Sequence, residues 1–293
     1  SSTAKKDKIV AEADWYRSIP NALSIFTPRF IRGGVTDTEA WYETEYLCLP
    51  SLSELFVFGE LPVFAWSSVF QRCDEFLASM ACITPPEPAE DTSGLFLSKT
   101  IQRLEAHSEM TGVSLQREWR VAGVRLPSLE VLVESAAQLL SDGDELRHWG
   151  VWHGDYCLSN ILYDFRARRV FAVDPRGYVE GRANGVCGDR RYDVAKLYHS
   201  IVGRYDHIRA GRFVVSGIDS GDVALDLPHS PTVLAVEREF LSRSFGGYDT
   251  SAPAICAMVT LLFLSMLPLH SDSRIVQDGF LANALRLSAT WLD

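Results

Sequence analysis

Three residues with oxygen-bearing side chains are spaced as phosphoryl transfer would require. Asp155 is followed five residues later by Asn160, and Asp174 stands fourteen residues beyond Asn160, after an apolar stretch at 170–173. Transfer to a hydroxyl needs a proton acceptor beside that hydroxyl, and Mg²⁺ needs hard oxygen ligands. We therefore interpret Asp155 as the catalytic base, and Asn160 and Asp174 as ligands of the Mg²⁺ that bridges the phosphates of ATP.

These residues belong to a longer motif that begins at His153. The order His153, Asp155, Asn160 and then Asp174 matches the catalytic-loop pattern of kinases. With Gly154 between the histidine and the aspartate, the run resembles the aminoglycoside phosphotransferase and choline kinase family, small-molecule relatives of the protein kinases. The resemblance implies an α+β, bilobal, protein-kinase-like fold.

The resemblance also implies how the chain divides. Residues 1–47 would form a reduced N-terminal sheet lobe that contains the first helix and the hinge strand. Residues 48–293 would form a mainly helical C-terminal lobe that carries the catalytic loop and the metal-binding hairpin.

Two further residues complete the expected catalytic set. His153 is predicted to brace the loop, because the chemistry already has a carboxylate. The run at 188–197, GDRRYDVAKL, resembles the family's G-D-x-x-Y-D-x-A segment at the start of a helix. Asp189 suits a helix cap there, and the resemblance implies that it also ties down the loop around His153. Tyr192 and Asp193 are interpreted as structural.

Four residues near the N-terminus are expected to bind the nucleotide. Glu12, in a predicted helix, resembles the glutamate of kinases that pairs with the lysine that binds the ATP phosphates. Glu45, Tyr46 and Leu47 resemble the hinge whose backbone groups read the adenine edge. The sequence leaves open whether ATP or GTP is the donor.

A kinase lobe begins with a glycine-rich hairpin and a strand that bears the lysine. Only eleven residues precede Glu12 in this sequence, and neither feature is recognisable among them. We therefore expect an upstream domain or segment to complete the N-terminal lobe.

Composition narrows the class of protein. With 47% hydrophobic and 23% charged residues, the 293-residue chain has a normal globular composition. Its net charge of −10 argues against nucleic acid as a partner. The six cysteines form no CxxC pair, which favours reduced thiols in a cytoplasmic protein. Residues 252–269 carry no charge, but two prolines interrupt them, so a buried helix is favoured over a membrane span.

Hydrophobic periodicity predicts the elements around the motif. Residues 83–94 and 214–228 read as loops. Strands are expected at 41–47, 150–153, 161–163 and 170–173, and helices at 8–19, 66–81, 95–107, 128–142, 192–201, 231–244, 252–267 and 273–291.

The predicted acceptor is a hydroxyl of a small molecule, such as a sugar, polyol or amino alcohol. No A-P-E run follows Asp174, so a protein acceptor is disfavoured. Arg176 suggests an anionic group near the site, either a phosphate, a carboxylate or an acidic sugar, although a structural ion pair is equally compatible. The alternative is a kinase-fold binding or scaffold protein without catalysis, and a metal-dependent hydrolase would lack both a nucleophile and a cluster of metal ligands.

Overall fold

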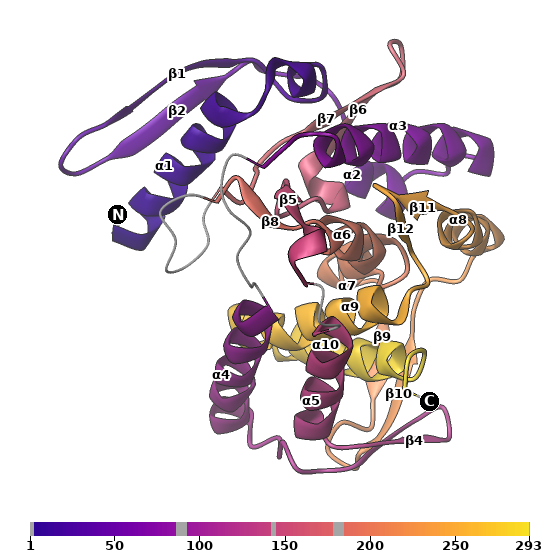
Figure 1. Cartoon of the computed structure of the whole chain (residues 1–293). Helices are drawn as coiled ribbons and strands as arrows, with labels where there is room; N and C mark the ends of the chain where they lie inside the picture. Colours follow the sequence, from indigo (N-terminus) through magenta and orange to yellow (C-terminus); the bar gives the residue numbers. More distant parts are fainter. Residues whose placement is uncertain (1–2, 86–92, 142–144, 178–184, 293) are drawn as a thin grey trace. The chain divides into compact units, whose positions relative to one another are not determined.

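The computed structural model describes residues 3–85, 93–141, 145–177 and 185–292 (Figure 1). The chain forms two compact units, each assembled from three segments of the sequence. The first unit comprises Ser1–Glu90, His148–Leu197 and Ser242–Asp249, and the second comprises Asp91–Arg147, Tyr198–Leu241 and Thr250–Asp293. The lobe boundary predicted after Leu47 lies inside the first unit and stays a prediction.

The first unit begins with a helix and a hairpin. Helix α1 (Thr3–Ser18) ends before Pro20, and the short helix η1 (Asn21–Phe26) follows it. Strands β1 (Phe30–Val35) and β2 (Ala40–Thr44) then pair antiparallel, and α1 packs against β2 (Figure 1). Strand β2 ends three residues earlier than predicted, and residues 45–50 continue without a ladder partner.

Two helices follow the hairpin in the first unit. Helix α2 (Leu52–Val57) starts with a capping box, in which the side chains of Ser51 and Glu54 each accept a hydrogen bond from the other's backbone N–H. Helix α3 (Val63–Ala81) confirms the predicted helical stripe, because its buried side chains recur at the expected spacing: Trp66, Val69, Phe70, Cys73, Phe76, Leu77 and Met80.

The motif residues lie on short elements of the first unit. Strand β5 (Trp149–Val151) precedes the catalytic loop and pairs antiparallel with β8 (Cys187–Asp189). The turn η3 (Leu158–Asn160) leads into the hairpin of β6 (Ile161–Asp164) and β7 (Arg169–Ala172). Helix α6 (Arg191–Ile201) starts directly after β8, and a small hairpin of β11 (Ser244–Phe245) and β12 (Tyr248–Asp249) completes the unit.

The second unit is built around helix α9 (Pro253–Met266). Its ten residues from Ile255 to Leu264 are all buried, and α4 (Ser93–Thr111), α5 (Leu129–Leu140) and α10 (Arg274–Ser288) pack against it. The segment Pro253–His270 is long and apolar enough to cross a membrane, but this burial within the unit is typical of a core helix. The remaining helices of the unit include η2 (Glu145–His148), α7 (Tyr205–Arg209), α8 (Pro231–Leu241) and η4 (Leu267–His270).

The prediction of a loop at 214–228 is wrong. These residues form β9 (Val214–Ser216) and β10 (Asp222–Asp226), which join β3 (Trp119–Val121) and β4 (Val124–Leu126) in a sheet of order β4-β3-β10-β9. Gly217 and Gly221 made the segment resemble a loop, but they have positive φ angles and shape the turn between the two strands.

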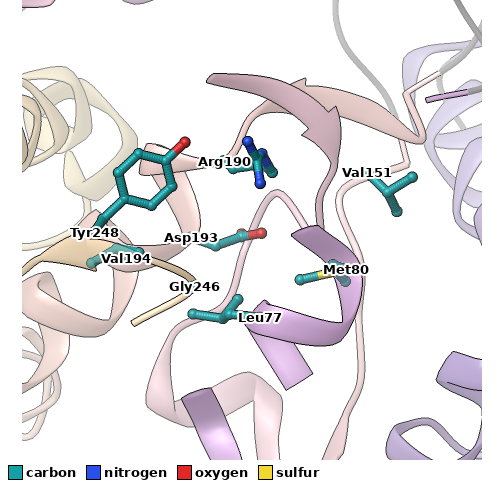
Figure 2. Close-up of a pocket in the computed structure, with 8 residues that line it drawn as sticks. All are labelled: Leu77, Met80, Val151, Arg190, Asp193, Val194, Gly246 and Tyr248. Carbon is teal, nitrogen blue, oxygen red and sulfur yellow. The ribbon is translucent and has the colours of Figure 1, made fainter. Parts of the chain in front are cut away.

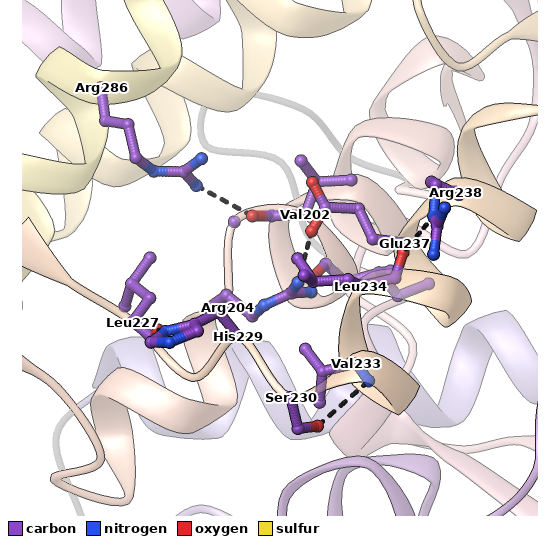
Figure 3. Close-up of polar contacts among 12 residues, drawn as sticks. Val202, Arg204, Leu227, His229, Ser230, Val233, Leu234, Glu237, Arg238 and Arg286 are labelled. Atoms are coloured by element: carbon purple, nitrogen blue, oxygen red, sulfur yellow. Dashed lines mark hydrogen bonds and ion pairs between the residues drawn. The ribbon is translucent and has the colours of Figure 1, made fainter.

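Two arginines, one buried and one half-buried, stabilise the connections of the second unit (Figure 3). Arg204, which has φ 52° at the start of α7, is 3% exposed and forms an ion pair with Glu237 of α8. Arg286 of α10 donates to the carbonyl oxygen of Val202 at 2.9 Å. Since these cations are matched by a carboxylate or a carbonyl, they act as structural ties.

Candidate active site

The register of the β6–β7 hairpin brings the two predicted metal ligands together. Ile161 pairs with Ala172, and one step outward the N–H of Val173 donates to the carbonyl oxygen of Asn160 at 2.9 Å. Asp174 is therefore the first residue beyond the pairing, next to Asn160. It is exposed and has φ 53°, a left-handed conformation that is uncommon outside glycine.

Asn160 also connects this hairpin to the catalytic loop. Its Nδ2 donates to the backbone carbonyl oxygen of Asp155 at 3.0 Å. Because the amide nitrogen is engaged, the amide oxygen Oδ1 is oriented away from Asp155, and Ser159 Oγ donates to it at 3.3 Å. The structure thus places Asp155, Asn160 and Asp174 in one continuous turn-and-hairpin unit.

Gly154 allows the catalytic loop to turn close to the segment after β7. It has φ +77°, and an added Cβ would lie 2.7 Å from Cβ of Arg176. The N–H of Arg176 donates to the carbonyl oxygen of His153 at 2.9 Å, which fixes this approach. A larger residue between His153 and Asp155 would therefore be both strained and obstructed.

His153 is enclosed by aromatic rings. It is fully buried, and its ring centroid lies 5.6 Å from those of Trp15 and Tyr156 and 6.4 Å from that of Phe76. Burial lowers the pKa of the imidazole to about 4, against the opposing effect of the Asp155 charge. The ring is therefore neutral at pH 7 and lies within a packed aromatic cluster.

The loop is held by Asp193, whereas Asp189 has a different partner. Asp193 accepts hydrogen bonds from the N–H groups of His153 at 2.7 Å and Gly154 at 2.8 Å. Burial raises the pKa of Asp193 to about 7, although these N–H groups oppose the increase. The contacts seen for Asp189 in the described part of the chain go to Arg191, through its N–H at 2.9 Å and its guanidinium at 2.7 Å. The role implied for Asp189 at the loop is thus performed by Asp193, four residues further along.

Asp155 lies beside a lysine that the sequence did not single out. Lys196 Nζ is 2.7 Å from Asp155 Oδ1, and the carboxylate side chain remains 41% exposed. Partial burial alone would raise the pKa of Asp155, but Lys196, followed by Arg176, lowers it to about 2. Asp155 is consequently ionised throughout the physiological range. Lys196 lies three residues after Asp193 on α6, so the two side chains share one side of the helix, but the sequence alone does not indicate that this side faces the catalytic loop.

Glu12 lies on α1, next to the segment that carries Asp174. An added Cβ at Gly177 would approach the backbone of Ala11 to 2.4 Å and that of Glu12 to 2.6 Å, so this segment packs directly on α1. The Glu12 side chain is buried, accepts a hydrogen bond from Tyr42 at 3.1 Å and pairs with Lys8 at 3.3 Å. Burial raises the pKa of Glu12, and Lys8 opposes this effect. The cation that pairs with Glu12 is thus one helical turn away.

The predicted hinge residues follow β2. The N–H of Glu45 donates to the carbonyl oxygen of Arg29 at 2.8 Å, whereas Tyr46 is 87% exposed. Among the described residues, no backbone–backbone hydrogen bond involves Tyr46 or Leu47.

The donor set around Asp174 fits Mg²⁺ bound together with a phosphate. In the described part of the chain, no group of three or more His, Cys, Asp or Glu side chains could hold a metal ion. Mg²⁺ commonly takes one or two protein oxygens, and phosphates and water supply the others. If Mg²⁺ binds here, Asn160 and Asp174 would be the residues that supply such a pair of oxygen ligands.

A small pocket borders the site but does not contain it (Figure 2). It has an empty volume of about 220 Å³, part of it open to solvent. Its polar lining comes from Arg190, Asp193 and Tyr248, and Leu77 and Met80 of α3 supply apolar side chains. Asp155, Asn160 and Asp174 do not line it, so the candidate site is identified by its side chains rather than by this pocket.

Comparisons with known proteins identify the fold. No family model matches the chain, and no curated protein matches it. The solved structures that it resembles include the aminoglycoside phosphotransferase APH(3'')-Id from Streptomyces rimosus in complex with ADP and streptomycin, at 17% identity and a TM-score of 0.55, over 90% of this chain and 84% of that one.

Two other solved structures also resemble this chain, each at 15% identity and with a TM-score of 0.50. The aminoglycoside phosphotransferase APH(4)-Ia, as a thermostable mutant in its apo form, is covered over 80% of its length by 98% of this chain. A glucosamine kinase in complex with glucosamine, ADP and inorganic phosphate is covered over 68% of its length by 99% of this chain. These likenesses confirm the α+β, kinase-like fold class expected from the sequence: the chain has the fold of the aminoglycoside phosphotransferases and of glucosamine kinase.

Proposed function

We propose that this protein is an ATP- and Mg²⁺-dependent phosphotransferase that moves the γ-phosphoryl group to a hydroxyl of a small molecule. The observation that carries the proposal is the arrangement of Asp155, Asn160 and Asp174 on one loop and hairpin, held together by the bonds from Asn160 Nδ2 and Val173 N. Two of the neighbours in fold support this reading, because their structures contain ADP, one with streptomycin and the other with glucosamine. A sugar, polyol or amino alcohol is the proposed acceptor class.

In the proposed reaction, the acceptor hydroxyl donates a hydrogen bond to Asp155 and its oxygen attacks the γ-phosphorus. A new O–P bond forms while the bond from the γ-phosphorus to the β,γ-bridging oxygen breaks, and ADP leaves with that electron pair. The proton moves along the hydrogen bond late in the transfer and passes on to water, because a pKa of about 2 makes Asp155 a transient acceptor. Mg²⁺, when bound by Asn160 and Asp174, would neutralise phosphate charge.

The proposal also assigns roles to the residues around Asp155, Asn160 and Asp174. Glu12 orders the nucleotide side of the site, and the segment of Glu45, Tyr46 and Leu47 reads the base. His153 braces the loop by packing, and Asp189 acts as a cap and ion-pair partner of Arg191. The location proposed is the cytoplasm, which the six free cysteines support.

An acceptor screen tests the function. Transfer from ATP and from GTP, with Mg²⁺, is measured to glucosamine, streptomycin, choline and hydroxy acids. Asp155→Asn should lower kcat about 100-fold or more, since it removes the charged hydrogen-bond acceptor. Asp174→Ala should abolish Mg²⁺-dependent transfer. Full activity in Asp174→Ala would refute the metal role.

Asp164→Asn is the matched control for these variants. Asp164 ends β6 in the same hairpin and accepts hydrogen bonds from the N–H groups of Arg166 and Ala167 at 2.8 and 2.9 Å. Asparagine preserves this turn, so this variant should keep wild-type activity. A protein that neither binds Mg·ATP nor transfers phosphate to any acceptor would instead be a kinase-fold binding or scaffold protein.

A further inference from the structure

Helix α6 contacts the catalytic loop through two charged side chains of opposite sign. Asp193 holds the backbone N–H groups of His153 and Gly154, and Lys196 holds the side chain of Asp155. Residues three apart lie on the same side of a helix. The helix therefore fixes both the backbone of the loop and the carboxylate that the loop presents.

The ion pair between Lys196 and Asp155 is asymmetric. The Lys196 side chain is only 10% exposed, whereas that of Asp155 is 41% exposed. A cation that loses its water needs a compensating charge, and Asp155 supplies it. The carboxylate, in contrast, keeps a substantial part of its surface available to a ligand.

The contacts of Asp155 leave one of its oxygens to the acceptor. The Lys196 ammonium lies 2.7 Å from Oδ1, and Cys157 Sγ lies 3.9 Å from that same oxygen. No side-chain contact to Oδ2 is seen among the described residues. A carboxylate attached at one oxygen cannot rotate freely, so its second oxygen keeps a fixed direction.

We propose that Lys196 is a positioning residue for phosphoryl transfer, which holds Asp155 by Oδ1 so that Oδ2 meets the acceptor hydroxyl. This inference rests on the proposed function and adds a residue to it. The nearby cation Arg176 has a different setting, because its guanidinium lies 5.2 Å from the ring centroid of Tyr192 and its N–H bonds to His153. Lys196 is thus the cation that contacts Asp155 directly.

Steady-state kinetics with Mg·ATP, and with whichever compound of the acceptor panel is phosphorylated, test the role. Lys196→Met should lower kcat about 100-fold, because misdirecting a reacting group by about 1 Å has an effect of this size. The KM values for ATP and acceptor should change less than about threefold, since Lys196 is not proposed to touch either. Lys196→Arg restores the charge and should recover at least about tenfold of the lost kcat.

A double-mutant cycle separates positioning from other roles. Once Asp155→Asn has removed the charged partner, adding Lys196→Met should lower single-turnover transfer by less than about threefold. A further loss of about 100-fold in that background would overturn the proposal, because Lys196 would then act independently of Asp155. A wild-type kcat in Lys196→Met would overturn it as well and would leave the proposed function intact.

Arg274→Met serves as the control for removal of a helical ion pair. Arg274 Nε lies 2.8 Å from Asp278 Oδ1 in the second unit, and the variant should keep wild-type kcat. Melting curves confirm that each variant is folded at the assay temperature. A wild-type protein without any transfer would refute the proposed function, and the role of Lys196 with it.

Discussion

At the scale of single residues, Gly154 determines whether the catalytic loop can adopt the conformation that positions Asp155. Two separate constraints act on it, a positive φ and the approach of Arg176. Gly112 has a similar φ of +73°, but nothing lies within 4 Å of an added Cβ there. Both glycines have a positive φ, but of the two only Gly154 has neighbouring atoms in the place of an added Cβ.

We predict different outcomes for alanine at these two glycines. Gly112→Ala should lower the free energy of unfolding by about 1 kcal/mol, the cost of the backbone conformation alone. Gly154→Ala should cost about 2 kcal/mol more, because Arg176 must move, and it should also reduce phosphotransfer at least tenfold. Denaturant unfolding and the transfer assay measure both effects. Equal destabilisation by the two variants would show that the close approach has no energetic consequence.

His153 gives a prediction about pH. Its pKa is about 4 in the folded protein and about 6.5 when unfolded, so the unfolded state binds more protons between these values. The contribution of His153 to stability is therefore complete above pH 6.5 and is lost as the pH falls toward 4. At about 1.4 kcal/mol for each pH unit, the loss approaches 3 kcal/mol.

The difference between wild type and His153→Gln isolates this contribution from that of Asp193. The advantage of wild type in free energy of unfolding should shrink as the pH is lowered from 6.5 to 4. His229→Gln is the control for replacing a histidine, because His229 is 78% exposed and its replacement should change the free energy of unfolding at pH 7 by less than about 0.5 kcal/mol. A constant difference between wild type and His153→Gln would contradict the buried neutral imidazole.

At the scale of elements, helix α1 supports the segment that leads from β5 into the catalytic loop. Trp15 is fully buried, and its Nε1 donates to the carbonyl oxygen of Trp152, the residue after β5, at 2.8 Å. Its ring also contacts that of His153. The helix that carries Glu12 and the strand that leads into the catalytic loop are thereby joined by one side chain.

Removing this single bond should destabilise the first unit. Trp15→Phe leaves the carbonyl of Trp152 without its donor and opens a small cavity, so we expect a loss of about 2–4 kcal/mol. Trp41→Phe on β2 is the comparison, since Trp41 is 40% exposed, and should cost less than about 1 kcal/mol. Thermal or denaturant unfolding measures both, and similar losses would contradict the role of Trp15.

The elements that could be predicted from the sequence are those with strong local periodicity. The stripe of α3 and the hairpin of β6 and β7 needed no long-range information. Strands β3 and β10 were missed because each pairs with a partner about 100 residues away, as Val121 does with Val223. Strand β3 has three residues and β10 has five, and strands this short show little hydrophobic periodicity.

The contacts of the candidate site likewise include some that could be predicted from the sequence and some that could not. Asp155, Asn160 and Asp174 lie within twenty residues, and their proximity follows from one hairpin register. The contacts of Asp193 and Lys196 depend on the direction in which α6 leaves β8, which side-chain spacing alone does not specify. The family resemblance placed the loop contact at Asp189, whose carboxylate instead pairs with Arg191.

At the scale of the whole molecule, all the candidate site residues belong to the first unit, although they come from two of its three sequence segments. The part of the site proposed to hold the transferred phosphate is formed by Asp155, Asn160 and Asp174. A ligand that binds only the folded unit stabilises it by mass action, whichever acceptor the protein uses. Ligand-linked stability can therefore test nucleotide binding without knowledge of the acceptor.

We predict that Mg·ATP raises the melting temperature and that Asp174→Ala removes the effect. At a ligand concentration of about 100 times Kd, the stabilisation is about 2.7 kcal/mol, which corresponds to a rise on the order of 5 °C. Mg²⁺ alone should give no comparable rise, because Asn160 and Asp174 supply too few ligands to hold the ion without phosphate oxygens. Asp164→Asn, at the far end of β6, should keep the full shift. An equal shift in Asp174→Ala would mean that nucleotide binds without a metal contact at that carboxylate, and Asp174 would then have to be removed from the site.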